Sequence, residues 1–302
     1  MSVNKVPAKY LVSINMNGLE GRMLRYPLNN SSNDILFVGD LRSNIEYWWG
    51  LARALHDFAT VTIPDLPGIG GMDSFYHINV RPSINNYADY LATFIKMRYK
   101  HKKFVCIGAG FGFVVITRML QKHPDLKRNI KLLVSFGGFA DHDDFVLSKR
   151  QYFLSLYATA LFSRRLPSFI LKFIVSREVV WRRISSRSLP GSIPSKEKQK
   201  LIDVEVERWL SGDLRTYLVI SNELAWFTNC KVPIELDVWH VGLRSSYLNW
   251  RRVLRHMNQV FANCHYLSSS KATNNYSLLR SKKSAAVFLP TNIKRQIKLA
   301  CD

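Results

Sequence analysis

The stretch from Phe104 to Met119 reads FVCIGAGFGFVVITRM and restricts the fold more than any other part of the chain. An apolar run, a glycine-rich turn and a second apolar run with helical spacing predict a buried strand, a tight turn and a helix. The turn consists of Gly108, Ala109, Gly110, Phe111 and Gly112. Three glycines at alternate positions indicate a backbone that is strained or closely approached by its neighbours.

Apolar runs alternate with amphipathic segments on both sides of this turn. Residues 10–15 and 22–26 around Asn17-Gly18 predict a β-hairpin. Further strands are expected at residues 34–38, 59–63, 130–136, 232–239 and 263–267, and helices are expected after most of them, one with Ser83 as its N-cap. The predicted class is therefore α/β, a mostly parallel sheet of about eight strands covered by helices on both faces.

The alternation stops near Gly137-Gly138 and resumes at Val232. The intervening sequence is helical in pattern, aromatic and basic. We therefore expect a core formed by residues 1–143 and 215–302, with residues 144–214 inserted as a helical cap. The apolar residues of this insertion predict packing over the sheet, and the basic residues between them leave open a surface for anionic lipid.

The order of several short motifs resembles the α/β-hydrolase superfamily. Gly108–Gly112 is similar to the nucleophile elbow G-x-S-x-G, which presents a serine on a strand-to-helix turn. Val38-Gly39 stands where the family has His-Gly, and residues 64–70 are similar to its D-x-x-G-x-G turn. Val232-Pro233-Ile234 is similar to the strand before the catalytic acid. The resemblance covers most of the chain outside residues 144–214.

The resemblance implies a degenerate catalytic triad. The nucleophile position is Gly110, which has no side chain. The acid position falls on Ser245, and the base position falls on Asn274 or a neighbour. No Asp or Glu occurs from 241 to 301, and no His occurs after His265. A hydrolase of this type needs all three groups, so the chain is expected to be non-catalytic.

The same resemblance places an oxyanion hole between two backbone N–H groups, that of Phe111 and one in the turn Gly39-Asp40-Leu41. A carboxylate at Asp40 is the opposite of what such a hole requires, because negative charge develops there during the reaction. These three positions (Gly39, Asp40 and Phe111) are the expected pocket residues.

Other sites remain open in the sequence. Glycine-rich strand–turn–helix units also bind phosphates, but this turn follows the third α/β unit and no acid closes the next strand. A relocated hydrolase or acyl-transferase site could use Asp141–Asp144 or His240. The run Asp141-His142-Asp143-Asp144 could ligate a metal, but acids at the start of a helix more often complement its dipole. We expect neither a metal nor a cofactor.

The net charge of +21 is the one extreme feature of the composition. It favours weak electrostatic binding to nucleic acid or anionic membrane. Residues 251–302 contain ten Lys or Arg against Asp302 alone. No run is apolar enough to span a membrane, and four cysteines without framework spacing indicate a cytoplasmic protein. The expected function is that of a pseudohydrolase that binds a small-molecule or protein ligand, the alternatives being a relocated enzyme and a basic accessory protein.

Overall fold

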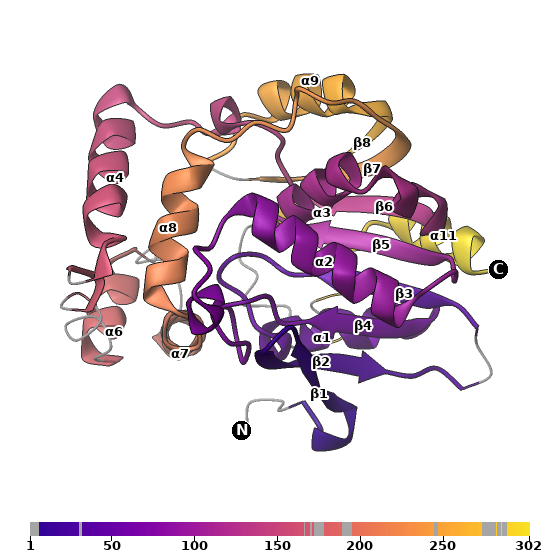
Figure 1. Cartoon of the computed structure of the whole chain (residues 1–302), viewed down its shortest axis with the longest axis horizontal. Helices are drawn as coiled ribbons and strands as arrows, with labels where there is room; N and C mark the ends of the chain where they lie inside the picture. Colours follow the sequence, from indigo (N-terminus) through magenta and orange to yellow (C-terminus); the bar gives the residue numbers. More distant parts are fainter. Residues whose placement is uncertain are drawn as a thin grey trace.

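The computed structural model describes residues 6–29, 32–165, 167–169, 171, 178–188, 195–244, 247–273, 282, 285 and 289–302. Ser245 and Asn274, the expected acid and base positions, lie outside the described residues. The described part forms one twisted sheet with helices on both faces and a group of helices beside it (Figure 1).

The sheet has eight strands in the order β1-β2-β4-β3-β5-β6-β7-β8. Their bounds are Leu11–Met16, Leu19–Tyr26, Thr60–Pro64, Asp34–Val38, Phe104–Ala109, Ile130–Phe136, Ile234–Arg244 and Phe261–Thr273 in that spatial order. β2 runs antiparallel to both its neighbours, and the strands from β4 to β8 are parallel. The fold class is therefore the α/β arrangement that the sequence predicts, with β5 near the centre.

Two hydrophobic layers enclose the sheet. Helices α1 (Ile45–Leu55) and α11 (Thr291–Cys301) cover one face, where Phe37 and Ile107 point. Helices α2 (Ile84–Arg98), α3 (Phe111–Lys122) and α9 (Trp250–Val260) cover the other face, where Leu36 and Cys106 point. Alternate residues of the same strands enter opposite layers because side chains alternate along a strand.

Local signals in the sequence account for most boundaries. The β1–β2 hairpin turns at Asn17 and Gly18, whose φ angles of 53° and 83° suit a type I′ turn. Ser83 caps α2 by accepting a hydrogen bond from Asn86 N–H, as expected. β7 and β8 extend beyond their predicted ends, to Arg244 and Thr273, because β7 and the edge strand β8 pair with each other despite their polar residues.

Helices α4 (Lys149–Phe162), α6 (Glu178–Ser188), α7 (Ser195–Leu210) and α8 (Leu214–Leu224) connect β6 to β7. In Figure 1, α8 lies between α4 and the sheet. The Tyr152 hydroxyl donates to the Ala225 carbonyl oxygen, and the Asn222 amide donates to the Leu156 carbonyl oxygen, which attaches α4 to α8. Within the described residues, short 3-10 helices lie at Ala8–Tyr10, Phe75–Ile78, Pro124–Asn129 and His142–Asp144.

In the residues that the structure describes, no helix combines the length and the apolar composition that crossing a bilayer requires.

Candidate functional site

The elbow predicted from the sequence is present at the end of the central strand β5. Gly110 has φ 51° and ψ −119°, a backbone conformation that non-glycine residues adopt only under strain. Its N–H donates to the Phe136 carbonyl oxygen of β6 at 3.0 Å, and its carbonyl oxygen accepts the first helical bond from Phe113 N–H. Gly110 therefore stands at the strand-to-helix turn, and Phe111 opens α3.

Close packing explains the other two glycines of the turn. A Cβ on Gly108 would lie 2.7 Å from the Cα of Phe113, and one on Gly112 would lie 2.4 Å from the carbonyl oxygens of Val38 and Gly39. The nearest contact in each case is to a backbone atom, which cannot move aside as a side chain can. Helix α3 thus packs tightly against β5 and against the end of β3 because these two positions lack side chains.

The Asp40 carboxylate fills the space above Gly110. Its Oδ1 accepts a hydrogen bond from the backbone N–H of Phe111 at 2.9 Å. A Cβ built on Gly110 would lie 2.4 Å from the same Oδ1 and 2.7 Å from Cγ. The carboxylate therefore occupies the volume that a nucleophilic side chain would need, and it binds the N–H expected to serve as an oxyanion donor.

The same contact caps α3. Gly110 is the N-cap residue and provides no side-chain hydrogen bond. Asp40 supplies the missing acceptor from another loop, and its negative charge stands at the positive end of the helix dipole. The sequence placed a carboxylate near the expected oxyanion hole, and the structure shows the acceptor and its donor in direct contact.

The loop that carries Asp40 is held by a chain of hydrogen bonds. The Ser43 hydroxyl donates to the Asp40 carbonyl oxygen at 2.7 Å, and Trp48 Nε1–H donates to the Ser43 hydroxyl at 2.7 Å. Gly39 lies against this chain, since a Cβ there would come within 2.6 Å of Trp48 Nε1. The Asp40 backbone is thereby tied to the buried helix α1.

A partly buried ion-pair network supports the neighbouring turn. Asp65 accepts hydrogen bonds from Arg22 Nε, from Ile45 N–H and from Gly71 N–H at 2.9, 3.1 and 2.8 Å. Arg22 also binds both carboxylate oxygens of Glu46. Burial raises the pKa of Asp65 to about 6, against the attraction of Arg22. The network is structural, because its polar atoms are directed at one another and at backbone groups.

The cavities beside the elbow are small. One, lined by residues that include Asp40, Asp65 and Ile69, has a volume of about 10 Å³. The other lies between Arg42, Gly68 and Trp209 and has a volume of about 20 Å³. Each is close to the volume needed for one water molecule, far below the several hundred Å³ of typical ligand pockets.

Residues of α6 and α7 close over this region. The indoles of Trp181 and Trp209 stack with centroids 3.9 Å apart, and the Arg42 guanidinium lies 4.9 Å from the Trp209 ring centroid. Asp213 N–H donates to the Gly68 carbonyl oxygen at 2.8 Å. The loop that positions Asp40 therefore also contacts the inserted helices, through Arg42.

His240, considered for a relocated site, lies inside the sheet. Its Nδ1 is 2.9 Å from the Ser135 hydroxyl on the neighbouring strand β6, and the two residues are Cα partners. The exposed fractions are 2% for His240 and 0% for Ser135. Burial lowers the pKa of His240 to about 4, so the ring is neutral at pH 7. The pair has the composition of a nucleophile and base but is sealed from solvent.

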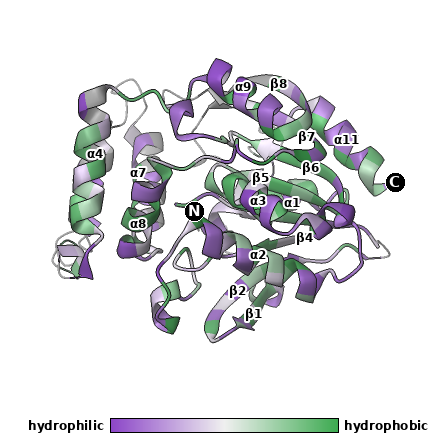
Figure 2. Cartoon of the chain, turned by 45° about the horizontal axis from the view of Figure 1, so that its top comes forward, coloured by the Kyte–Doolittle hydropathy of each residue, from purple (hydrophilic) through white to green (hydrophobic). Residues whose placement is uncertain are grey.

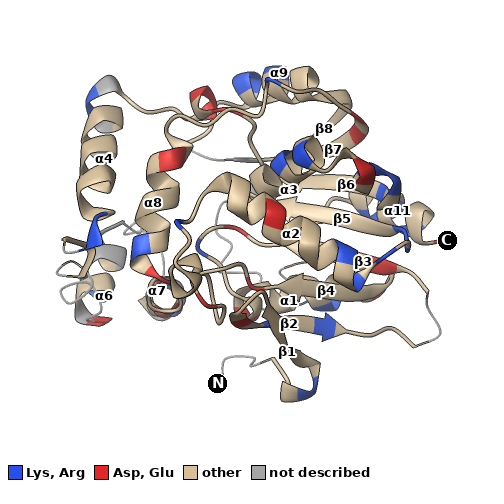
Figure 3. Cartoon of the chain, in the orientation of Figure 1, with Lys and Arg blue, Asp and Glu red and all other residues tan. Residues whose placement is uncertain are grey.

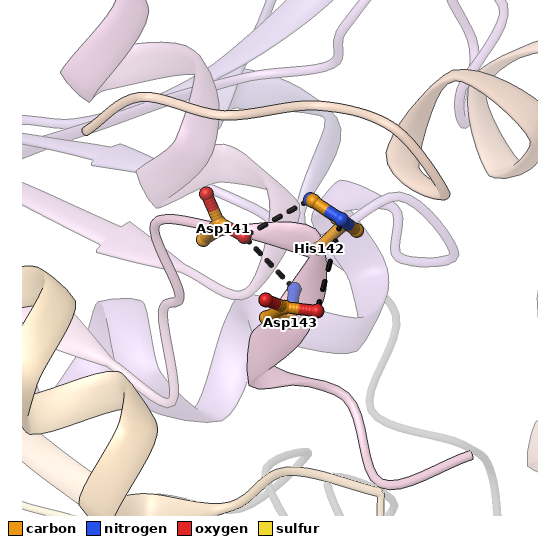
Figure 4. A group of neighbouring side chains, drawn as sticks. All are labelled: Asp141, His142 and Asp143. Carbon is orange, nitrogen blue, oxygen red and sulfur yellow. Dashed lines mark hydrogen bonds and ion pairs between the residues drawn. The ribbon is translucent and has the colours of Figure 1, made fainter. Parts of the chain in front are cut away.

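The acidic run after β6 forms a capped turn. Asp141, His142 and Asp143 bring potential ligand atoms within 4.8 Å of one another (Figure 4). The Asp141 carboxylate accepts from Asp143 N–H at 2.9 Å, and Asp144 accepts from Asp141 N–H at 3.1 Å, forming a capping box. Asp144 also binds His256 Nδ1 at 2.7 Å on α9. These contacts give the Asp141 and Asp144 carboxylates structural partners within the turn and on α9.

The described residues thus bring together four of the expected positions: Gly39, Asp40, Gly110 and Phe111. The missed element is the direction of the Asp40 side chain. Two features of the sequence could have indicated this direction. Gly110, the N-cap of α3, has no side chain to accept a hydrogen bond, and an acid, Asp40, follows the end of the neighbouring strand.

Comparison with known proteins gives a fold and no sequence relative. The sequence matches no protein-family model, and no curated protein matches it. Many solved structures are similar. A candidate epoxide hydrolase from Pseudomonas aeruginosa has TM-score 0.68 at 14% identity, covering 97% of each chain. An esterase from Thermogutta terrifontis has TM-score 0.64 at 14% identity, covering 97% of this chain and 99% of the esterase.

A third similar structure is the enol-lactonase from Burkholderia xenovorans, with TM-score 0.65 and 13% identity over 92% of this chain and 99% of the lactonase. Identities this low establish the fold alone. The chain therefore has the α/β-hydrolase fold over nearly its whole length.

Proposed function

We propose that this chain is a non-catalytic α/β-hydrolase-fold protein whose elbow is closed by its own Asp40 carboxylate. The observation that carries the proposal is the contact of Asp40 Oδ1 with Phe111 N–H, in the space beside Gly110. At this one place Gly110 provides no nucleophile, and Asp40 binds the N–H group that was expected to serve as an oxyanion donor.

Electrostatics make this contact inhibitory for acyl transfer. An oxyanion hole contributes through donors aimed at the developing negative charge, and losing one donor slows such enzymes by about a hundredfold to a thousandfold. Here the donor is bound by a carboxylate, which also repels a second anion. A substrate carbonyl would have to displace Asp40 before it reached Phe111 N–H.

The remaining role is binding. In our proposal, residues 1–143 and 215–302 form the scaffold and residues 144–214 form a cap over the closed elbow. The cavities beside Asp40 and Trp209 are too small for a ligand, which favours recognition at a surface other than the closed elbow. A cytoplasmic location belongs to the same proposal, supported by four free cysteines in the structure.

The test is hydrolysis of short acyl esters of p-nitrophenol by the purified chain. We expect no turnover above a heat-treated sample. Gly110→Ser should also show none, because its Cβ would clash with the Asp40 carboxylate and the expected base position holds no histidine. Lys122→Ser, which adds a serine at an exposed position of the same helix, controls for nonspecific effects. Saturable wild-type turnover lost in Asp40→Ala would refute the proposal.

The second candidate is a relocated hydrolase site at Ser135 and His240, favoured by their 2.9 Å hydrogen bond. It requires an opening that admits substrate to two buried side chains. Turnover that survives Gly110→Ala and disappears in both Ser135→Ala and His240→Ala would establish this candidate in place of the first.

A further inference from the structure

Helix α4 is apolar on two opposite faces. Its inner face contacts α8 through Tyr152, Leu156 and Thr159, and Leu156 is buried. A helix that is hydrophobic all round is normally buried within a protein or a membrane. In Figure 1, however, α4 lies at the edge of the molecule, with α8 on one side only.

The outer face carries four large exposed hydrophobic residues. The exposed fractions are 52% for Phe153, 73% for Leu154, 71% for Tyr157 and 51% for Leu161. Their spacing of one, three and four residues places them on one side of the helix. Figure 2 shows hydrophobic residues along the length of α4. The face is thus a continuous apolar stripe, which monomeric proteins seldom leave in water.

Basic residues flank the stripe at both ends. Arg150 is exposed in the first turn, and Arg164 and Arg165 are exposed just after the last turn. Figure 3 shows basic residues, in blue, at both ends of α4. The sequence from 145 to 177 contains no Asp or Glu. An apolar centre with cations at its ends matches the boundary between acyl chains and anionic headgroups.

We propose that the outer face of α4 binds the surface of an anionic lipid bilayer, with the helix lying in the membrane plane. Leu154, Tyr157 and Leu161 would enter the acyl boundary, and the flanking arginines would contact lipid phosphates. At 1.5 Å per residue the helix is about 21 Å long, which suits a contact parallel to the bilayer and not a crossing.

Charge decides against two other occupants. A second copy docked on α4 through a twofold axis would bring Arg150, Arg164 and Arg165 of both copies together without any acid in the segment. A nucleic acid would pair with the arginines but would leave Leu154 and Leu161 in water. A lipid surface satisfies both the charges and the apolar stripe. This inference does not depend on the closed elbow, since lipid binding can be measured without reference to hydrolysis.

The experiment is sedimentation of the full chain with vesicles at about 0.1 M salt. One vesicle is pure phosphatidylcholine, and the other contains about one third phosphatidylglycerol. We expect preferential binding to the anionic vesicles. Leu154→Glu and Tyr157→Glu should each lower the partition coefficient about tenfold or more, because an apolar contact is replaced by a charge that the surface repels.

The matched control is Leu299→Glu on α11, where the leucine is 60% exposed and the change in charge is the same. It should alter binding by less than about threefold. Leu154→Ser removes the apolar contact without adding charge and separates the two contributions. Replacing Arg164 and Arg165 by Gln should reduce the preference for anionic vesicles by roughly fivefold per residue. Circular dichroism verifies that each variant is folded.

The proposal would be overturned by no binding of the wild type to anionic vesicles, by equal loss in Leu154→Glu and Leu299→Glu, or by unchanged binding in the α4 variants. A wild-type dimer that dissociates in Leu154→Glu and ignores vesicles would assign the face to a second copy. Binding of duplex DNA without vesicle binding would assign the arginines to nucleic acid. Either outcome also overturns the proposal.

Discussion

The Asp40 carboxylate and the Phe111 N–H lie 71 residues apart in the sequence and 2.9 Å apart in the structure. Their hydrogen bond joins the loop after β3 to the first turn of α3. Two adjacent parallel strands, β3 and β5, are thereby closed together at their carboxyl ends. In a sheet of this type, ligands bind at that edge. The contact therefore occupies the position where the fold usually places its chemistry.

Asp40→Ala should destabilise the protein by about 1–2 kcal/mol, because Phe111 N–H loses its acceptor and α3 loses its cap. Asp40→Asn keeps an acceptor oxygen and loses only the charge at the helix terminus, so the expected loss is about 0.5 kcal/mol. Urea unfolding measures both. Glu235→Ala, at a side chain that is 91% exposed, is the control. Equal stability of Asp40→Ala and wild type would contradict the capping role.

Gly110→Ala should cost more, about 3 kcal/mol, since alanine is strained at φ 51° and its Cβ would meet Asp40. In an Asp40→Gly background the steric contact is absent and only backbone strain remains. The double variant Asp40→Gly/Gly110→Ala should therefore lose less unfolding free energy than the two single variants lose together, by about 1 kcal/mol or more. Unfolding free energies of the four proteins complete this cycle, and strict additivity would argue against the contact.

His240 should make stability depend on pH. Burial lowers its pKa in the folded protein to about 4, from the 6.5 of an exposed histidine. The unfolded chain binds the proton more readily, so protonation of His240 favours unfolding. The stability that the neutral ring contributes is therefore complete above pH 6.5 and is lost as the pH falls toward 4. At about 1.4 kcal/mol per pKa unit, the loss approaches roughly 3 kcal/mol.

His240→Gln keeps a polar side chain near Ser135 and cannot titrate in this range. The difference in unfolding free energy between wild type and variant should therefore shift in favour of the variant from pH 6.5 to pH 4. The comparison cancels titrations shared by both proteins, including Asp65, whose raised pKa acts in the opposite direction. A constant difference across this range would show that His240 keeps its ordinary pKa.

The stacked indoles should anchor the inserted helices. Trp209→Ala removes contacts to Trp181, Arg42 and Tyr217 and should destabilise the protein by about 2 kcal/mol or more. Trp181→Phe keeps a ring but removes an N–H that is buried without a hydrogen-bond partner. It should change stability by less than about 1 kcal/mol. Both variants should lose the far-ultraviolet exciton signal of the stacked pair. Its persistence would show that the indoles are not stacked in solution.

The elbow could be predicted because its determinants are neighbours in the sequence. An apolar run, alternating glycines and an apolar helix specify the turn locally, and the positive φ of Gly110 follows from them. The hairpin at Asn17-Gly18 and the cap at Ser83 are local in the same sense.

The direction of the Asp40 side chain could not be predicted in this way. It depends on the approach of α3 to the loop after β3, which is a contact between distant residues. His240 gives a second example. The predicted strand ended at Trp239, but β7 continues to Arg244 between two partner strands, so His240 is buried within the sheet instead of lying at its edge.

The pairing of Gly110 with Asp40 couples substitution at the two positions. A serine at position 110 alone would be forced against the carboxylate, and loss of Asp40 alone would remove the cap of α3. Each single replacement therefore lowers stability. A side chain can occupy position 110 without this clash only when both residues change together, so the two positions behave as one unit under mutation.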